Sequence, residues 1–228
     1  GAWSSMAWDA NRGNIIIYGG GHANYPGNEL YFWESSTLNW ARASLPSELK
    51  FIASGHYESI DGVFNAPVAA HTYDNSEFFP VLDRFVTFGG AAFNTGTRFV
   101  HADGSPTGPY FFNPALADGD AVGGTTGSQV NSQLFPNVIG KNMWSNRDNL
   151  IPATPGDILP SYFINTATAY AEENGVDVLY LQANNRLFRY SAYSNSDSSQ
   201  DTYEVVGNVA SGSTFSGQGA GAYDPQRK

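Results

Sequence analysis

Short runs of β-branched and aromatic residues, bounded by Gly, Asn, Asp and Pro, recur from one end of the chain to the other. Apolar positions with helical periodicity are hard to find, and short apolar runs between turn residues are typical of β-strands. The pattern therefore predicts a nearly all-β protein. The expected strands cover residues 4–8, 14–18, 29–33, 40–43, 69–73, 84–88, 110–112, 167–170, 177–181, 187–190 and 203–206.

One longer pattern repeats within the chain. Small residues lead to an aromatic residue, often followed by Asp, a turn, and then an apolar run that sometimes ends in Gly-Gly. It begins at Ser4 (SSMAWDANRGNIIIYGGG), at Ala69 (AAHTYDNSEFFPVLDRFVTFGG), more weakly at Ala167, and again at Gly219. Because a sequence repeat usually corresponds to one supersecondary unit, we expect each copy to form one antiparallel sheet.

The first copy carries a set of residues in a specific order. An apolar strand ends in Gly19-Gly20, the third strand follows Asn28-Glu29 and contains Tyr31, and the fourth strand contains Trp40. In this order the sequence resembles the blade of a kelch-type β-propeller, including the propeller domain of the galactose oxidase family. The resemblance is fullest over residues 3–46 and declines through 69–114 to 167–206.

The resemblance implies a kelch-like β-propeller over residues 1–228. Blade 1 is expected at about 3–46, blade 2 at 69–114, an insertion at 115–164, blade 3 at 165–206, and the first strand of a fourth blade at 219–228. About three blades leave the ring incomplete, since closed propellers have about four to eight. We therefore expect a piece of a longer product, completed by the rest of its own chain or by another subunit. The alternative is an open β-array covered by a partner chain.

Composition and charge narrow the classes of partner and of chemistry. Only 14% of the residues are charged and the formal net charge is −10, so we expect no nucleic-acid partner and no membrane partner. Cys is absent, which excludes disulfides, thiolate metal sites and the Tyr–Cys copper-radical site of galactose oxidase. Low charge and loops rich in Asn, Ser and Gly permit an extracellular bacterial protein or a phage particle as the setting.

The long segments are expected to lie on one face of the propeller. In an antiparallel four-stranded blade, the loop between the second and third strands and the link to the next blade emerge at the same end. The long loops 21–28 and 91–109 are of the first kind, and the links 46–67 and 114–164 are of the second. Long loops on a rigid scaffold commonly carry binding sites, so this face is the predicted working surface.

Several side chains on these segments are candidates for chemistry. His22, Tyr25, His56 and Tyr57 could act as base and acid in β-elimination from a uronic-acid polysaccharide, with Arg or Asn neutralising the carboxylate. The candidate ligand-binding residues are His22, Asn24, Tyr25, Asn28, Arg98 and His101. His71, on an expected inner strand, is assigned a structural role, and His22 could equally brace its loop.

The function predicted from the sequence is non-enzymatic recognition of carbohydrate or protein, or a structural scaffold. Aromatic rings suit the faces of sugar rings, and the amides and hydroxyls of these loops suit sugar hydroxyls. The alternative function is a polysaccharide lyase that uses a His/Tyr pair. No metal or cofactor is expected, apart from a weak indication of calcium at Asp118 and Asp120, which could supply oxygen ligands.

Overall fold

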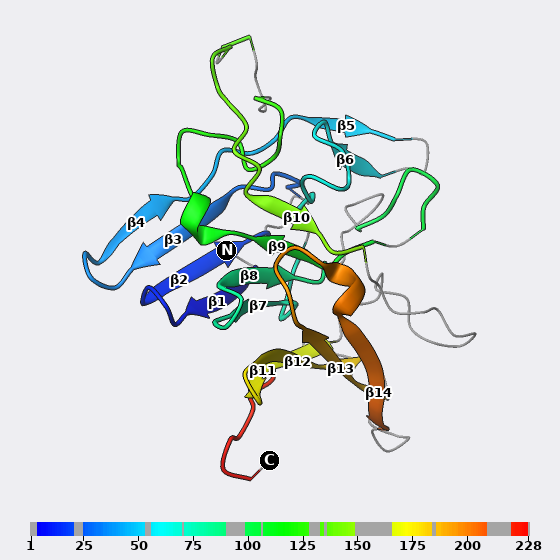
Figure 1. Cartoon of the computed structure of the whole chain (residues 1–228). Helices are drawn as coiled ribbons and strands as arrows, with labels where there is room; N and C mark the ends of the chain where they lie inside the picture. The colour runs from blue at the N-terminus through cyan, green and yellow to red at the C-terminus, as the bar shows by residue number, and fades with distance from the viewer. Residues whose placement is uncertain are drawn as a thin grey trace.

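The computed structural model describes residues 4–20, 25–52, 56–69, 71–89, 99–105, 107–127, 133–134, 136–148, 166–183, 186–208 and 220–227. Over these residues the chain is all β, as the sequence predicted, and no α-helix occurs among them. The short 3-10 helices η1 (Pro114–Leu116) and η3 (Ser198–Gln200) lie between strands. Figure 1 shows the arrangement of the sheets.

The described strands form three four-stranded antiparallel sheets and one hairpin, and in each large sheet neighbouring strands follow one another in the chain. The first sheet contains β1 (Ser5–Asp9), β2 (Asn14–Tyr18), β3 (Leu30–Glu34) and β4 (Asn39–Arg42). The second contains β7 (Ser76–Phe79), β8 (Arg84–Thr87), β9 (Tyr110–Phe112) and β10 (Trp144–Asn146). The third contains β11 (Thr166–Glu173), β12 (Val176–Ala183), β13 (Arg186–Ala192) and β14 (Thr202–Asn208). The hairpin pairs β5 (Leu49–Phe51) with β6 (Tyr57–Ser59).

The second sheet is the central layer of the molecule. Successive side chains of a strand point to opposite faces. Phe78 of β7 joins the core shared with the first sheet, whereas the next residue, Phe79, joins the core shared with the third. On β8, Phe85 likewise joins the core shared with the first sheet, and Val86 joins the core shared with the third. The first strands also lie side by side, since β1 contacts β7 and β7 contacts β11 (Figure 1). The three sheets are therefore stacked in chain order.

Hydrogen bonds and an ion pair connect neighbouring sheets at the end that carries the short turns, such as β1–β2 and β7–β8. The guanidinium of Arg12, in the β1–β2 turn, donates to both carboxylate oxygens of Asp83, in the β7–β8 turn, at 2.6 Å each. Asp177 of β12 accepts hydrogen bonds from the backbone amides of Val81 and Leu82, at 3.1 and 2.7 Å. The turn of the second sheet is thus bonded to the sheet on each side.

A buried ion pair also joins the second and third sheets. Arg147, directly after β10, forms a two-pronged pair with Asp201 at 2.9 Å for each bond, and their side chains are 3% and 0% exposed. The same guanidinium donates to the carbonyl of Ser194 and lies 4.7 Å from the ring centre of Phe111. This charge is neutralised inside the fold and does not face solvent.

The expected strands of the first and third sheets are confirmed, with ends shifted by a few residues. The expected inner strand of the second sheet, residues 69–73, is wrong, because β7 lies at Ser76–Phe79. Since the second sheet is covered on both faces, β7 places a phenylalanine on each side, Phe78 and Phe79, and lacks the alternation of a half-exposed strand.

The segment 115–164 is not wholly an insertion between sheets. It contains β10, which pairs with β9 as the fourth strand of the second sheet. The connection from β9 to β10 therefore leaves from the end with the short turns. Part of it then runs beside β4, where Leu45 donates to the carbonyl of Ala121. At the other boundary, the described residues 220–227 form no strand, so the expected first strand of a fourth sheet is not seen there.

The face of the first sheet that points away from the second sheet is rich in aromatic residues. Trp8, Ile15, Trp33 and Trp40 are direct cross-strand neighbours in one row across all four strands. Met6, Ile17, Tyr31 and Arg42 form the adjacent row. Trp8 is 53% exposed and Trp40 is 59% exposed, so these rings do not contribute to the stacking of sheets within the described residues.

Candidate functional site

Three of the long segments meet at the end of the second sheet that lies opposite the short turns. We call this end the loop end. His101 comes from the β8–β9 loop, Asp148 follows β10, and Phe64 belongs to the link that precedes β7. The imidazole Nε2 of His101 lies 2.9 Å from Oδ1 of Asp148. The ring of Phe64 lies 5.5 Å from the His101 ring, centre to centre, and is 57% exposed. An imidazole, a carboxylate and an exposed aromatic ring thus share one surface.

A buried network fixes the carboxylate of this cluster. Thr107, which is buried, donates its hydroxyl to Asp148 Oδ1 at 2.7 Å, and Asn146 donates to the Thr107 hydroxyl at 2.7 Å. The Asn146 side chain also accepts from the Asp148 amide and donates to the carbonyl of Val63. Asp148 has a φ of +43°, a conformation that costs free energy in non-glycine residues. The surrounding bonds hold Asp148 in that conformation.

The His101 imidazole and the Asp148 carboxylate are both partly exposed to solvent and can form further hydrogen bonds. The His101 and Asp148 side chains are 24% and 40% exposed. Both hydrogen bonds to the carboxylate reach Oδ1, and none of the bonds within the described residues uses Oδ2. The cluster can therefore accept a hydrogen bond from a ligand hydroxyl at Oδ2 and form another at the second nitrogen of His101.

The other predicted site residues are dispersed or lie outside the described residues. His22, Asn24 and Arg98 belong to the latter group. Tyr25 donates to Glu29 at 3.2 Å, and burial together with this carboxylate raises the pKa of Tyr25. Asn28 is buried, and its amide bonds Ser47 and the carbonyl of Pro67, so it ties its loop to the following link.

His56 and Tyr57 belong to the β5–β6 hairpin. The Tyr57 ring packs on Phe51 with centres 5.4 Å apart, and Tyr57 also lines a small cavity with Val63 and Val100. The Nδ1 atom of His56 is buried and has no hydrogen-bond partner among the described residues. His71 is also buried and lies before β7, with its ring edge-on to Tyr73. Among the described histidines, His101 lies against the carboxylate of Asp148, whereas the ring contact of His71 is with Tyr73.

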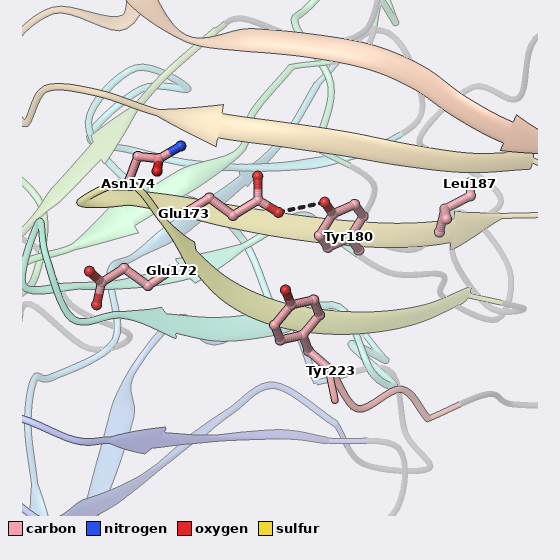
Figure 2. Close-up of a pocket in the computed structure, with 6 residues that line it drawn as sticks. All are labelled: Glu172, Glu173, Asn174, Tyr180, Leu187 and Tyr223. Atoms are coloured by element: carbon pink, nitrogen blue, oxygen red, sulfur yellow. Dashed lines mark hydrogen bonds between the residues drawn. The ribbon is translucent and has the colours of Figure 1, made fainter. Parts of the chain in front are cut away.

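A second, larger hollow lies on the face of the third sheet that points away from the second sheet. Figure 2 shows its lining residues, with the hydroxyl of Tyr180 donating to Glu173 at 2.6 Å. The hollow measures about 520 Å³, and Tyr223 from the C-terminal segment stacks on Tyr180 with rings 5° from parallel. Arg189 neutralises Glu173 at 2.8 Å. Much of this polar lining is therefore paired within the chain.

The structure also bears on the metal and membrane predictions. Asp118 forms an ion pair with Lys141 at 2.7 Å, which lowers the pKa of Asp118, and Asp120 lies 3.6 Å from Arg42. The described part of the chain holds no group of three or more His, Asp or Glu side chains placed to bind a metal ion. None of the helices in that part is long and apolar enough to cross a membrane.

Comparisons with protein-family models and with curated proteins find no match to this sequence. The kelch resemblance therefore stays a prediction. Two residues of the cluster, Asp148 and Phe64, were missed by the sequence analysis. One signal could have located Asp148: Trp144 in NMWSNRD occupies the fourth strand of its sheet, as Trp40 does in LNWAR. The loop end of the second sheet begins just after that strand.

Proposed function

We propose that this chain is part of a kelch-like β-propeller that serves as a non-enzymatic recognition scaffold, and that its loop end binds carbohydrate. The observation that carries this proposal is the convergence of His101, Asp148 and Phe64, from three separate segments, at one end of a rigid stack of sheets. We propose an extracellular or virion-associated setting, in which such a module would present its loops to an external ligand.

The stacking of the sheets supports the propeller part of the proposal. Three four-stranded antiparallel sheets follow one another in chain order with their first strands side by side, as the inner strands of neighbouring blades do. Gly19 and Gly20 end β2 with φ values of +70° and +93°, where the repeat pattern requires a sharp turn.

The outer faces of the stack indicate what kind of partner would complete it. The second sheet shows that a sheet face in this molecule is covered by another sheet on each side. The outward face of the first sheet exposes Met6, Trp8 and Trp40, and large exposed apolar patches usually mark interaction surfaces. We propose that a further sheet, from the rest of the protein or from another subunit, packs there.

The described residues do not favour the lyase alternative. A lyase needs a cation or amide to neutralise the substrate carboxylate, and the described partner of Tyr25 is the carboxylate of Glu29. The raised pKa of Tyr25 also disfavours its use as a base near neutral pH.

A glycan array combined with a turnover assay tests the proposed function. The complete chain is expected to bind at least one class of carbohydrate on the array and to release no unsaturated product from uronic-acid polysaccharides. Turnover of such a polysaccharide would favour the lyase. An array without any bound glycan, together with a specific protein recovered by pull-down, would replace carbohydrate by protein as the ligand.

A further inference from the structure

The His101–Asp148–Phe64 cluster combines the groups that recognise a sugar ring. A pyranose presents hydroxyl groups at its edge and C–H bonds on its face. The side chains of Asp148 and His101 are joined through Oδ1 and Nε2 at 2.9 Å, which leaves Oδ2 and the second ring nitrogen to bond hydroxyls of one sugar. The exposed ring of Phe64 stands beside His101 and offers an apolar face for the C–H bonds.

The charge around the cluster selects among sugars. Asp148 carries a negative charge, and exposed Asp103 lies close enough to His101 to interact with it electrostatically. The cation nearest in sequence, Arg147, points inward and is neutralised by Asp201. The formal net charge of the chain is −10. While His101 is neutral, a carboxylated sugar meets repulsion here from both the local and the overall charge.

The cluster is organised before any ligand arrives. The carboxylate of Asp148 is fixed by Thr107, and its backbone amide is fixed by Asn146. These supporting side chains are themselves bonded to each other. Binding therefore needs little additional ordering of the acceptor, which reduces the entropic cost of association.

We propose that the His101–Asp148–Phe64 cluster is a subsite for an uncharged pyranose. Hydroxyls of the sugar bond Asp148 Oδ2 and the second nitrogen of His101, and the sugar ring lies on Phe64. This inference rests on the proposed function and adds the ligand class and the residues that select it.

Titration calorimetry with the complete chain tests the subsite. The probes are soluble neutral oligosaccharides derived from glucan, mannan, galactan and xylan, and uronate oligomers derived from alginate and polygalacturonate. The wild-type protein is expected to bind a neutral probe more tightly than either uronate. Phe64→Ala and Asp148→Asn are each expected to weaken that binding about tenfold. Asp148→Asn should also reduce the discrimination against uronates, because the repulsive charge is removed.

Phe51→Ala is the matched control. Phe51 is 60% exposed, compared with 57% for Phe64, but its ring packs on Tyr57 rather than on His101. It should leave the affinity unchanged, and circular dichroism should show an intact fold for every variant. Neutral binding that survives both cluster variants would overturn the subsite while leaving the proposed function standing. Preference for uronates would overturn the charge argument, and absence of any carbohydrate binding by the wild type would overturn the proposed function itself.

Discussion

Replacement of Glu77 by Gln tests how the second and third sheets are joined at their first strands. Glu77 lies on β7 and its Oε1 is 3.3 Å from the hydroxyl of Thr168 on β11. That hydroxyl donates its proton to the backbone carbonyl of Asp74, and the Thr168 amide donates to the Asp74 carboxylate at 2.8 Å. The same hydroxyl is also within donating distance of Glu77, and this long contact lowers the pKa of Glu77 by less than burial raises it. Burial, with a further contribution from the charge of Asp74, raises the pKa of Glu77 from 4.5 to about 7.

The size and sign of the effect follow from this pKa. Each pKa unit corresponds to about 1.4 kcal/mol, so ionisation of Glu77 destabilises the folded state by up to about 3 kcal/mol. Below the unfolded pKa of 4.5 both states are protonated and the stability is complete. Between 4.5 and about 7 the folded state binds more protons than the unfolded state, so stability falls as the pH rises. Above about pH 7 this contribution of Glu77 to the stability is fully lost.

Urea unfolding followed by Trp fluorescence at pH 5 and pH 8 measures this difference. Glu77→Gln should be more stable than the wild type at pH 8, by up to about 3 kcal/mol, and should gain much less at pH 5. Glu172→Gln, an exposed carboxylate on β11, is the control and should give nearly equal changes at the two pH values. An equal effect of Glu77→Gln at both pH values would refute the reasoning.

The remaining predictions concern packing and backbone conformation, and each is checked by chemical unfolding. Arg147→Met should destabilise the fold by about 3–5 kcal/mol, because it removes the cation that neutralises the buried carboxylate of Asp201, and adding Asp201→Asn should restore part of the loss. Trp144→Ala should lower the free energy of unfolding by about 4 kcal/mol, since Trp144 is 2% exposed and packs on Tyr18, Phe85 and Phe112. Trp40→Ala should lower it much less, because Trp40 is 59% exposed. Leu38→Gly should stabilise by about 1 kcal/mol, because Leu38 ends the β3–β4 turn with a φ of +57° and its side chain is 69% exposed. A loss of stability in Leu38→Gly, or equal losses for the two Trp variants, would contradict these assignments.

The sequence pattern was most informative where strands are joined by short turns and one face is exposed. The first sheet shows this, because its turns after Asp9 and Glu34 are short and its exposed and buried residues alternate along β1. The second sheet was harder to predict. Its β7 carries a phenylalanine on each face and so lacks the alternation of a half-exposed strand, and β10 is separated from β9 by a long connection, so it lacks the local signal of a hairpin.

The site was predicted only in part for a related reason. His101 was a candidate because it is a titratable residue in a long loop. Its partner Asp148 lies 47 positions away, and no motif connects the two. Phe64 was not distinguishable from a core residue, since an aromatic residue in a link is usually buried. Asn28 shows the opposite case, in which a polar loop residue expected to meet a ligand is buried and satisfied within the fold.

Hydrogen–deuterium exchange, with and without a bound neutral oligosaccharide, tests most directly the claim that the loop end of the second sheet is the recognition surface. Ligand-dependent protection is predicted in residues 60–66, 99–109 and 144–148, which surround His101, Phe64 and Asp148. Protection confined to the hollow around Tyr180 and Tyr223, or to the outward face of the first sheet, would contradict the account.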